Sequence, residues 1–434
     1  MSSINQKIKS VTLNCEGVKV PGIVVEKQLS RLVLACMLWE KQFYYSGVES
    51  ADLIKDLVPK ANAAFVRALA IKARNEYKLR HVPLLLCREL ARIGKLDANT
   101  LDAVIQRADE MGEFLAIYWA EKRTPLSNQV KKGLAKAFCK FNEYELAKND
   151  KASATVSVRD VMFLAHAKPV NPAQEALFKR VANKELKVPD TWETQLSSGA
   201  DKGATFTRLM VEKKLGALAF LRNLRNMVQA GVSEAAIRDY SRSVNVDRVL
   251  PFRYLAAARI VPQFEDMLEA MMFRSLAGAK KLGGKTLLLV DVSPSMFGTK
   301  VSEKSDLDRY DAAAALAMLC SEVCETLEVY SFSTECVRVA PRKGFALIDA
   351  IKRSQANNGT LMGKAVKVAN SKGYDRLIVI TDEQSQDKVP NPIGNKAYIL
   401  NVASYKNGVN SSAWTTITGF SESCIDYIRE SEAE

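Results

Sequence analysis

The sequence predicts a two-part molecule, in which an all-α region is followed by a doubly wound α/β domain. Three observations lead to this fold class. The chain has 434 residues, which is too many for one ordinary hydrophobic core. Between about residues 27 and 276 apolar residues recur at helical spacing, and strand-like alternation is nearly absent. After about residue 281, short runs rich in Val, Ile and Leu alternate with helical stretches instead.

The first region, predicted to span residues 1–282, is a succession of amphipathic helices. Apolar residues lie three and four apart in LVLACMLWEKQFYYSG, ANAAFVRALAIKARNEY, VPLLLCRELARIG, SNQVKKGLAKAFCKFNEYELAK, VRDVMFLAHAKP and LGALAFLRNLRNMVQAGV. Breaking signals such as Gly94, Pro125, Pro169 and Gly231 divide these segments. Many such helices joined by short turns favour an α-solenoid, in which helix pairs stack on their neighbours, although no fixed repeat length is visible.

The second region, residues 283–434, has the pattern of a mainly parallel sheet covered by helices. We expect strands at TLLLVDV, LEVYSFS, DRLIVITD and KAYILNVAS. The stretches DRYDAAAALAMLCSEVCE, FALIDAIKRS and TLMGKAVKVANS between them are helical. Sites in sheets of this kind lie beyond the carboxyl ends of the strands. A site is therefore expected where TLLLVDV and VITD end.

Positive charge is concentrated in the first region. The net charge is +13, with 45 Lys and Arg against 30 Asp and Glu in residues 1–282, but 17 against 19 in residues 283–434. A basic excess confined to one region indicates a polyanionic partner, and nucleic acid is the first candidate. A solubilising surface charge is the simpler alternative.

Several functional classes lack their sequence features. No stretch approaches the roughly 18 apolar residues of a membrane span, and no secretory signal opens the chain, so we expect a cytoplasmic protein without a membrane. The eight cysteines form no CxxC pair, and Cys320 and Cys324 are expected to be buried, reduced thiols. The chain has two histidines, His81 and His166, and no nucleotide-binding glycine motif, so no catalytic set is expected.

Oxygen-bearing side chains gather at the predicted strand ends. Asp291, Ser293 and Ser295 occupy alternate positions after a buried strand, so they can converge on one point. Thr360 follows an Asn/Gly loop, and Asp382 ends a second strand. Together these residues make a hard oxygen set that suits Mg²⁺ or Mn²⁺ better than zinc. The alternative is a set of helix-capping hydroxyls beside a strand-end aspartate.

This arrangement resembles a von Willebrand factor A domain, a Rossmann-like fold. The resemblance rests on three motifs: DxSxS after a buried strand, a Thr after a Gly-containing loop, and a later strand that ends in Thr-Asp. The resemblance implies a metal-ion-dependent adhesion site. Its residues here are Asp291, Ser293, Ser295, Thr360 and Asp382. The resemblance implies that hydroxyls and a carboxylate bind a divalent cation, here Mg²⁺ or alternatively Mn²⁺, directly or through water, and that an open position accepts an acidic group of a partner.

Basic residues recur on several of the predicted helices. Lys132, Lys136 and Lys140 lie four apart, and further basic groups occur between residues 67 and 81 and at Arg222 and Arg225. A solvated helix face explains any one of these residues. An RNA-binding surface explains better why they recur.

Five segments are similar to the TROVE module of the Ro ribonucleoprotein family. They are KLRHVPLLLCREL, KGLAKAF…FNEYELAK, VRDVMFLAHAKP, LGALAFLRNLRNM and VLPFRYLAAARI, in family order from about Lys78 to Ile260. The resemblance implies HEAT-like helix pairs closed into a ring that admits single-stranded RNA ends. Lys148 and His166 match family positions near the RNA path. Where the family has a second basic residue this chain has Ala152, with Lys151 beside it.

The predicted function is non-enzymatic RNA binding in noncoding RNA stability or quality control. Its expected partners are misfolded noncoding RNA with single-stranded 3′ ends, small Y-type RNA on the outer surface and an exoribonuclease, and the expected state is a monomer. The predicted RNA contacts are Lys132, Lys136, Lys148, Lys151, His166, Arg222 and Arg225. The alternative is an adhesion-type scaffold whose cation binds an acidic partner protein. A metal-dependent hydrolase is a third class, and nothing in the sequence requires it.

Overall fold

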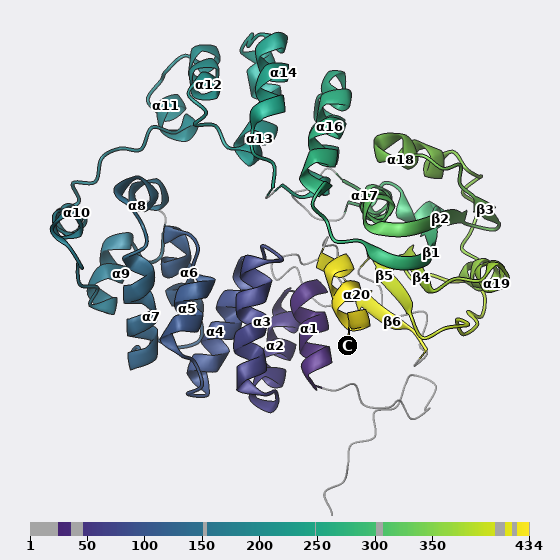
Figure 1. Ribbon diagram of the computed structural model, residues 1–434, viewed down its shortest axis with the longest axis horizontal. Helices are drawn as coiled ribbons and strands as arrows, with labels where there is room; N and C mark the ends of the chain where they lie inside the picture. Colours follow the sequence, from purple (N-terminus) through teal and green to yellow (C-terminus); the bar gives the residue numbers. More distant parts are fainter. Residues whose placement is uncertain are drawn as a thin grey trace, which may run out of the picture. The chain divides into compact units, whose positions relative to one another are not determined.

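The computed structural model describes residues 25–35, 47–150, 154–247, 249–300, 307–403, 413–418 and 423–433. The chain divides into two compact units (Figure 1). The helical unit comprises Val48–Gly278, and the α/β unit comprises Ala279–Glu434 together with residues 1–47. Within the described ranges no helix is long and apolar enough to cross a membrane.

The helical unit is built from short helices joined by tight turns. They are α2 (Gly47–Leu57), α3 (Ala63–Asn75), α4 (His81–Arg92), α5 (Ala98–Val104), α6 (Ala108–Tyr118), α7 (Asn128–Phe138), α8 (Glu143–Asn149), α9 (Val158–Ala165), α10 (Pro172–Asn183), α11 (Trp192–Ser197), α12 (Lys202–Val211), α13 (Ala217–Gln229), α14 (Glu234–Ser243), α15 (Pro251–Ile260) and α16 (Glu265–Leu276). Two short 3₁₀ turns, η1 (Val58–Lys60) and η2 (Pro262–Phe264), join them.

These helices stack in two layers, as the solenoid prediction requires. Helices α3, α5, α7 and α9 contact one another in succession, and α4 and α6 form the layer against them. The same alternation recurs later in the chain, where α12 contacts α14 and α14 contacts α16, while α13 contacts α15. Local sequence sets the helix ends: Asn62 caps α3 through Ala64 N and Phe65 N, and Gly231 ends α13 at φ +70°.

The α/β unit contains a six-stranded sheet. The strands are β1 (Leu282–Asp291), β2 (Cys324–Phe332), β3 (Cys336–Arg338), β4 (Arg376–Thr381), β5 (Ala397–Asn401) and β6 (Thr415–Thr418). The helices are α1 (Val25–Ala35), α17 (Arg309–Val323), α18 (Gly344–Lys352), α19 (Met362–Lys372) and α20 (Ser423–Ala433), with the 3₁₀ turn η3 (Pro294–Met296).

The sheet has the strand order β3-β2-β1-β4-β5-β6, and every pairing except the antiparallel β2–β3 pair is parallel. Leu287 and Leu289 of β1 pack with α19 on one face, and the intervening Leu288 and Val290 are buried as well, so both faces of the strand are covered. The predicted doubly wound sheet is therefore confirmed. Strands β1 and β4 lie side by side at its centre, and their carboxyl ends meet at one edge.

Helix α1 differs from the predicted division at residue 282. It precedes the helical unit in sequence, yet it packs against α20 and β6 of the α/β unit (Figure 1). Leu29, Val33 and Leu34 supply its buried face. The predicted helix LVLACMLWEKQFYYSG, residues 32–47, overlaps only the last turn of α1, and its residues 36–46 lie outside the described residues. An amphipathic pattern also does not indicate which surface will cover the apolar side of a helix.

Candidate functional site

The cluster of oxygen atoms lies at the carboxyl ends of β1 and β4. Asp291 is the last residue of β1 and Thr381 the last residue of β4, and both are fully buried. The Thr381 hydroxyl donates a hydrogen bond of 2.6 Å to Asp291 Oδ2. The backbone N–H of Ser293 donates to Asp291 Oδ1 at 2.8 Å. Because β1 and β4 are parallel neighbours, their carboxyl ends lie side by side and bring these side chains together.

The two serines follow Asp291 in a turn shaped by proline. Pro294 opens the 3₁₀ turn η3, where its fixed φ suits the first helical position. The hydroxyls of Ser293 and Ser295 are 3.1 Å apart. The Ser293 hydroxyl does not cap this turn, although Ser293 holds the N-cap position. The paired hydroxyls and the Asp291 carboxylate therefore stand within one short stretch of chain.

Thr360 is held in place by backbone contacts rather than by capping a helix. The backbone N–H of Gln386 donates to its carbonyl oxygen at 2.8 Å, and the preceding Gly359 N–H donates to the Ser333 hydroxyl at 3.2 Å. Helix α19 begins after Leu361. The first turn of α19 donates two hydrogen bonds to the Asp387 carboxylate, which lies in the loop after β4. The donors are the backbone N–H groups of Gly363, at 2.7 Å, and Lys364, at 2.8 Å. The capping alternative for Thr360 is wrong, because Asp387 occupies that role.

Asp382 has a cationic neighbour that the sequence did not reveal. Its Oδ2 lies 3.5 Å from Nη1 of Arg309, the first residue of α17. The same Nη1 donates to the backbone carbonyl of Ser295 at 3.3 Å. Glu383, a further buried carboxyl that sequence patterns did not single out, follows with φ +58°. Arg309 thus ties the strand end of β4 to the serine turn.

Burial dominates the electrostatics of this edge. The pKa of Asp291 is raised to about 7, mainly by desolvation and also by the neighbouring Asp382 charge, while the hydrogen bonds from Thr381 and Ser293 oppose the shift. Among the described residues no group of three or more His, Cys, Asp or Glu side chains is placed to hold a metal ion. A cation at this edge would therefore depend on hydroxyl oxygens, which fits Mg²⁺ or Mn²⁺ and does not fit zinc.

The predicted RNA contacts lie on several helices of the helical unit. Lys132 on α7 and Arg222 and Arg225 on α13 are exposed, and no hydrogen bond or ion pair of these side chains is seen in the described part of the chain. Lys136 donates to the Asn99 side chain at 2.6 Å. Lys148 is exposed on α8, and His166 is the C-cap of α9 in the left-handed conformation. Lys151 lies outside the described residues.

Other basic residues are paired within the fold. Lys140 donates to the carbonyl of Ile105 at 2.7 Å and forms an ion pair with Asp102 at 2.9 Å. It therefore holds α7 against the turn after α5. The recurrence of lysines along this segment overstated the unpaired charge, because Lys140 forms an ion pair and Lys136 is hydrogen-bonded to Asn99.

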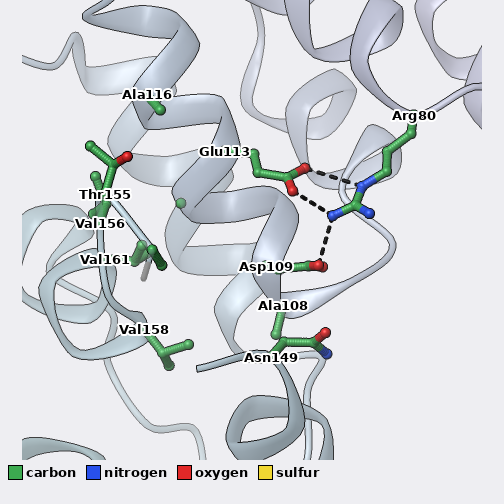
Figure 2. A pocket seen from close by; sticks show the side chains of 12 residues that line it. Arg80, Ala108, Asp109, Glu113, Ala116, Asn149, Thr155, Val156, Val158 and Val161 are labelled. Carbon is green, nitrogen blue, oxygen red and sulfur yellow. Dashed lines mark hydrogen bonds and ion pairs between the residues drawn. The ribbon is translucent and has the colours of Figure 1, made fainter. Parts of the chain in front are cut away.

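Arg74 and Arg80 form ion pairs with helix α6, and Figure 2 shows those of Arg80. Arg80 Nη2 lies 2.6 Å from Asp109, and its Nε donates to Glu113 at 3.1 Å. Arg74 pairs with the fully buried Glu110 at 2.6 Å. The expected basic face at this position is therefore wrong in part, since α6 neutralises Arg74 and Arg80.

A cavity of about 290 Å³ borders the same ion pairs. Arg80, Asp109 and Glu113 form its charged wall, and Val156 and Val161 contribute apolar surface (Figure 2). Because Arg80 already bridges the two carboxylates, this wall has little unpaired charge to offer a ligand. We assign the network to stability rather than to binding.

Comparison with known proteins places this geometry in context. A TROVE domain model matches residues 174–305, from helix α10 through the serine turn. Telomerase protein component 1 of Mus musculus is 33% identical over 92 residues, and the same protein of Rattus norvegicus is 32% identical over 92 residues. Each match covers 20% of this chain and only 4% of the length of the relative.

A solved structure has the same fold over nearly the whole chain. The crystal structure of the Ro (Rsr) protein of Deinococcus radiodurans aligns with a TM-score of 0.67 at 19% sequence identity, covering 93% of this chain and 98% of that one. The domain match, the relatives and the shared fold agree with the resemblance predicted from the sequence. The chain thus contains a segment that matches the TROVE domain and shares the fold of a Ro protein, and it is similar to the Ro family of TROVE-domain proteins.

Proposed function

We propose that the chain is a non-enzymatic RNA-binding protein that acts in noncoding RNA stability or quality control. The observation that supports this proposal is a set of exposed cationic side chains on the helical unit that form no ion pair within the described residues. Residues 48–278 hold 37 Lys and Arg against 27 Asp and Glu. Lys132, Arg222 and Arg225 are exposed there and lack an ion pair within the described residues. The TROVE-domain match and the fold shared with a Ro protein support RNA as the polyanion.

Unpaired cations of this kind bind phosphates with little regard to base sequence. Each neutralised phosphate releases condensed counterions, so affinity falls steeply as salt rises. We propose further that the stacked helices are HEAT-like pairs closed into a ring, which admits a single-stranded 3′ end and refuses a closed duplex. Small Y-type RNA would bind the outer basic surface, and an exoribonuclease would receive the threaded RNA. We propose that the protein acts as a monomer and that it is located in the cytoplasm.

The α/β unit is proposed to be a von Willebrand factor A-like domain with a divalent cation site. Asp291, Ser293, Ser295, Thr360 and Asp382 would hold Mg²⁺, or Mn²⁺, through their oxygen atoms. A bound cation would supply an attachment point for an acidic group of a partner. Because Arg309 already lies against Asp382, this carboxylate is the ligand whose charge is least available to the cation.

A binding titration tests the RNA proposal. The full chain is mixed with a labelled RNA hairpin that carries a single-stranded 3′ tail, and with the same hairpin with a blunt end, over a range of salt. We expect salt-dependent binding that favours the tailed hairpin. Undetectable binding, salt-insensitive binding, or equal affinity for both hairpins would contradict the proposal.

The adhesion-type scaffold is separated from RNA binding by two variants. Asp291→Ala removes a carboxylate from the proposed cation site and is expected to spare RNA binding. Lys148→Glu with His166→Ala alters the surface formed by exposed side chains of α8 and α9, here called the α8–α9 surface, and is expected to weaken RNA binding. The scaffold alternative requires the reverse: loss of the main interaction with Asp291→Ala and no effect of the second variant.

A further inference from the structure

Helices α8 and α9 carry the exposed aromatic side chains of the described residues. Tyr144 is 44% exposed and Phe163 is 53% exposed, whereas the other exposed large apolar residues in the described ranges are aliphatic. Exposing an aromatic ring to water is unfavourable, and interior packing explains neither ring at this degree of exposure. Both rings lie on two successive helices of the helical unit, the same two that carry Lys148 and end at His166.

A cationic side chain lies against each ring. Lys148 Nζ is 5.5 Å from the centre of the Tyr144 ring, one helical turn away on α8. The Arg159 guanidinium carbon is 5.3 Å from the centre of the Phe163 ring, also one turn away on α9. Each pair therefore combines a flat apolar surface with a positive charge at its side. A nucleotide offers the complementary combination of a flat base and an anionic phosphate.

The two helices are fastened to the same neighbours. The Asp150 side chain at the end of α8 accepts the backbone N–H of Val158 at the start of α9, at 3.1 Å. Both helices are also tied to the last turn of α10. Arg180 pairs with Glu143 of α8 at 3.0 Å, and Arg159 Nε donates to the Ala182 carbonyl at 2.8 Å. The rings thus project from a fixed framework rather than from a loose loop.

We propose that Tyr144 and Phe163 are stacking platforms for unpaired nucleobases of RNA. This inference rests on the proposed RNA-binding function and extends it from phosphates to bases. Aromatic stacking tolerates any base sequence, because every base presents a π-face. Bases inside a duplex are already stacked on one another and cannot engage a side chain in this way. The α8–α9 surface therefore selects single-stranded RNA by a mechanism separate from the width of any opening.

Two RNA probes distinguish stacking from charge attraction. Both are the same hairpin with a single-stranded 3′ tail, and the tail carries normal bases in one probe and abasic ribose in the other. The phosphates are identical, so any difference in affinity measures the bases. The full-length protein is expected to prefer the normal tail. Replacing both rings, Tyr144→Ala with Phe163→Ala, is expected to lower affinity for the normal tail about ten-fold or more and to leave the abasic tail nearly unchanged.

Matched variants control for folding and for general surface effects. Tyr144→Phe with Phe163→Tyr keeps both rings and is expected to bind the normal tail as the unaltered protein does. Val211→Ala removes an exposed apolar side chain of α12, 78% exposed, and is expected to change neither affinity. The double alanine variant is expected to keep the slope of affinity against salt, because no phosphate-binding cation is removed.

The outcomes separate the two proposals. If the unaltered protein binds neither probe, RNA binding itself is refuted, and stacking with it. If it binds both probes equally, or if the double alanine variant weakens both by the same factor, RNA binding stands and stacking is refuted. If Tyr144 and Phe163 bind a protein partner instead of RNA, the unaltered protein should bind the two probes equally.

Discussion

Arg376 of β4 and Glu432 of α20 form an ion pair that is almost completely buried, at the end of the sheet opposite the oxygen cluster. Their side chains are 2% and 8% exposed. Arg376 also donates to the Thr286 hydroxyl at 2.9 Å, and Lys396 lies 3.1 Å from Glu432. The C-terminal helix is thereby fixed to the central strands of the sheet.

Breaking this pair should destabilise the α/β unit severely. Glu432→Gln leaves the Arg376 charge buried without its carboxylate, and we expect a loss of about 3 kcal/mol in the free energy of unfolding, measured by urea denaturation. Replacing both residues, as Arg376→Met with Glu432→Leu, removes the buried charge altogether and should recover most of the loss. A double variant as unstable as the single one would contradict this account.

The same pair predicts a dependence of stability on acidity. Burial raises the pKa of Glu432, but the hydrogen bonds and charge of Arg376 outweigh it, so the pKa lies below its usual value. A carboxyl with a depressed pKa stabilises the fold above its unfolded pKa, about 4.3, and loses that contribution as the pH falls further. Between pH values near 5 and 3 the unaltered protein should therefore lose more stability than Glu432→Gln, measured by denaturation at each pH. Parallel losses would count against the pair as the cause.

Charge reversal on α13 should weaken RNA binding. Arg222→Glu with Arg225→Glu places two anions on a face that we propose meets phosphates. Affinity for a tailed hairpin should fall at least about ten-fold at low salt, and the salt slope should decrease by roughly 0.7 for each phosphate of the single strand that the variant no longer neutralises. Lys367→Glu, on an exposed position of α19 in the α/β unit, is the matched control. Equal effects of both charge reversals would mean that net charge alone governs binding.

Removing Arg80 should affect stability and leave RNA binding intact. Arg80→Ala leaves Asp109, Glu110 and Glu113 close together without their shared cation, which should cost about 2 kcal/mol in thermal or chemical denaturation of the helical unit. RNA affinity, measured where the variant is fully folded, should match that of the unaltered protein. A loss of affinity with no loss of stability would reassign Arg80 to the RNA surface.

Divalent cations should stabilise the unaltered protein. Mg²⁺ and Mn²⁺ at saturating concentration are expected to raise the unfolding temperature by a few degrees, since a ligand that binds the folded state alone stabilises it by mass action. Asp291→Asn should abolish this shift, and Asp349→Asn, at an exposed position of α18, should preserve it. Zn²⁺ giving a larger shift through Asp291 would contradict the hard oxygen site.

The elements that the sequence predicts best are those with a long local pattern. Strands β1, β2, β4 and β5 overlap the predicted runs because each contains a continuous buried stretch, although β1 and β2 begin several residues earlier than predicted. Strand β3, which spans Cys336–Arg338, is too short to produce a period, and it exists because β2 offers an edge for pairing. Local patterns specify that an element forms, whereas its partners are set by the folded chain.

The candidate sites divide along the same line. The proximity of Asp291 and Thr381 could be predicted, because the carboxyl ends of parallel neighbouring strands lie at the same edge of a sheet. The approach of Arg309 to Asp382 and the capping of α19 by Asp387 depend on contacts between distant segments, which spacing cannot reveal. Likewise, Arg74 and Arg80 look identical in sequence to the exposed Arg222, and only the position of α6 marks them as neutralised.

The attachment of α1 to α20 has a consequence for the chain's architecture. One folded body is assembled from segments on both sides of the solenoid in sequence, so the solenoid is an insertion within it. A fragment that begins at residue 283 therefore lacks Leu29, Val33 and Leu34, and the surface of α20 and β6 that α1 covers becomes exposed to water. Helix pairs, in contrast, could be gained or lost from the middle during evolution without disturbing the sheet.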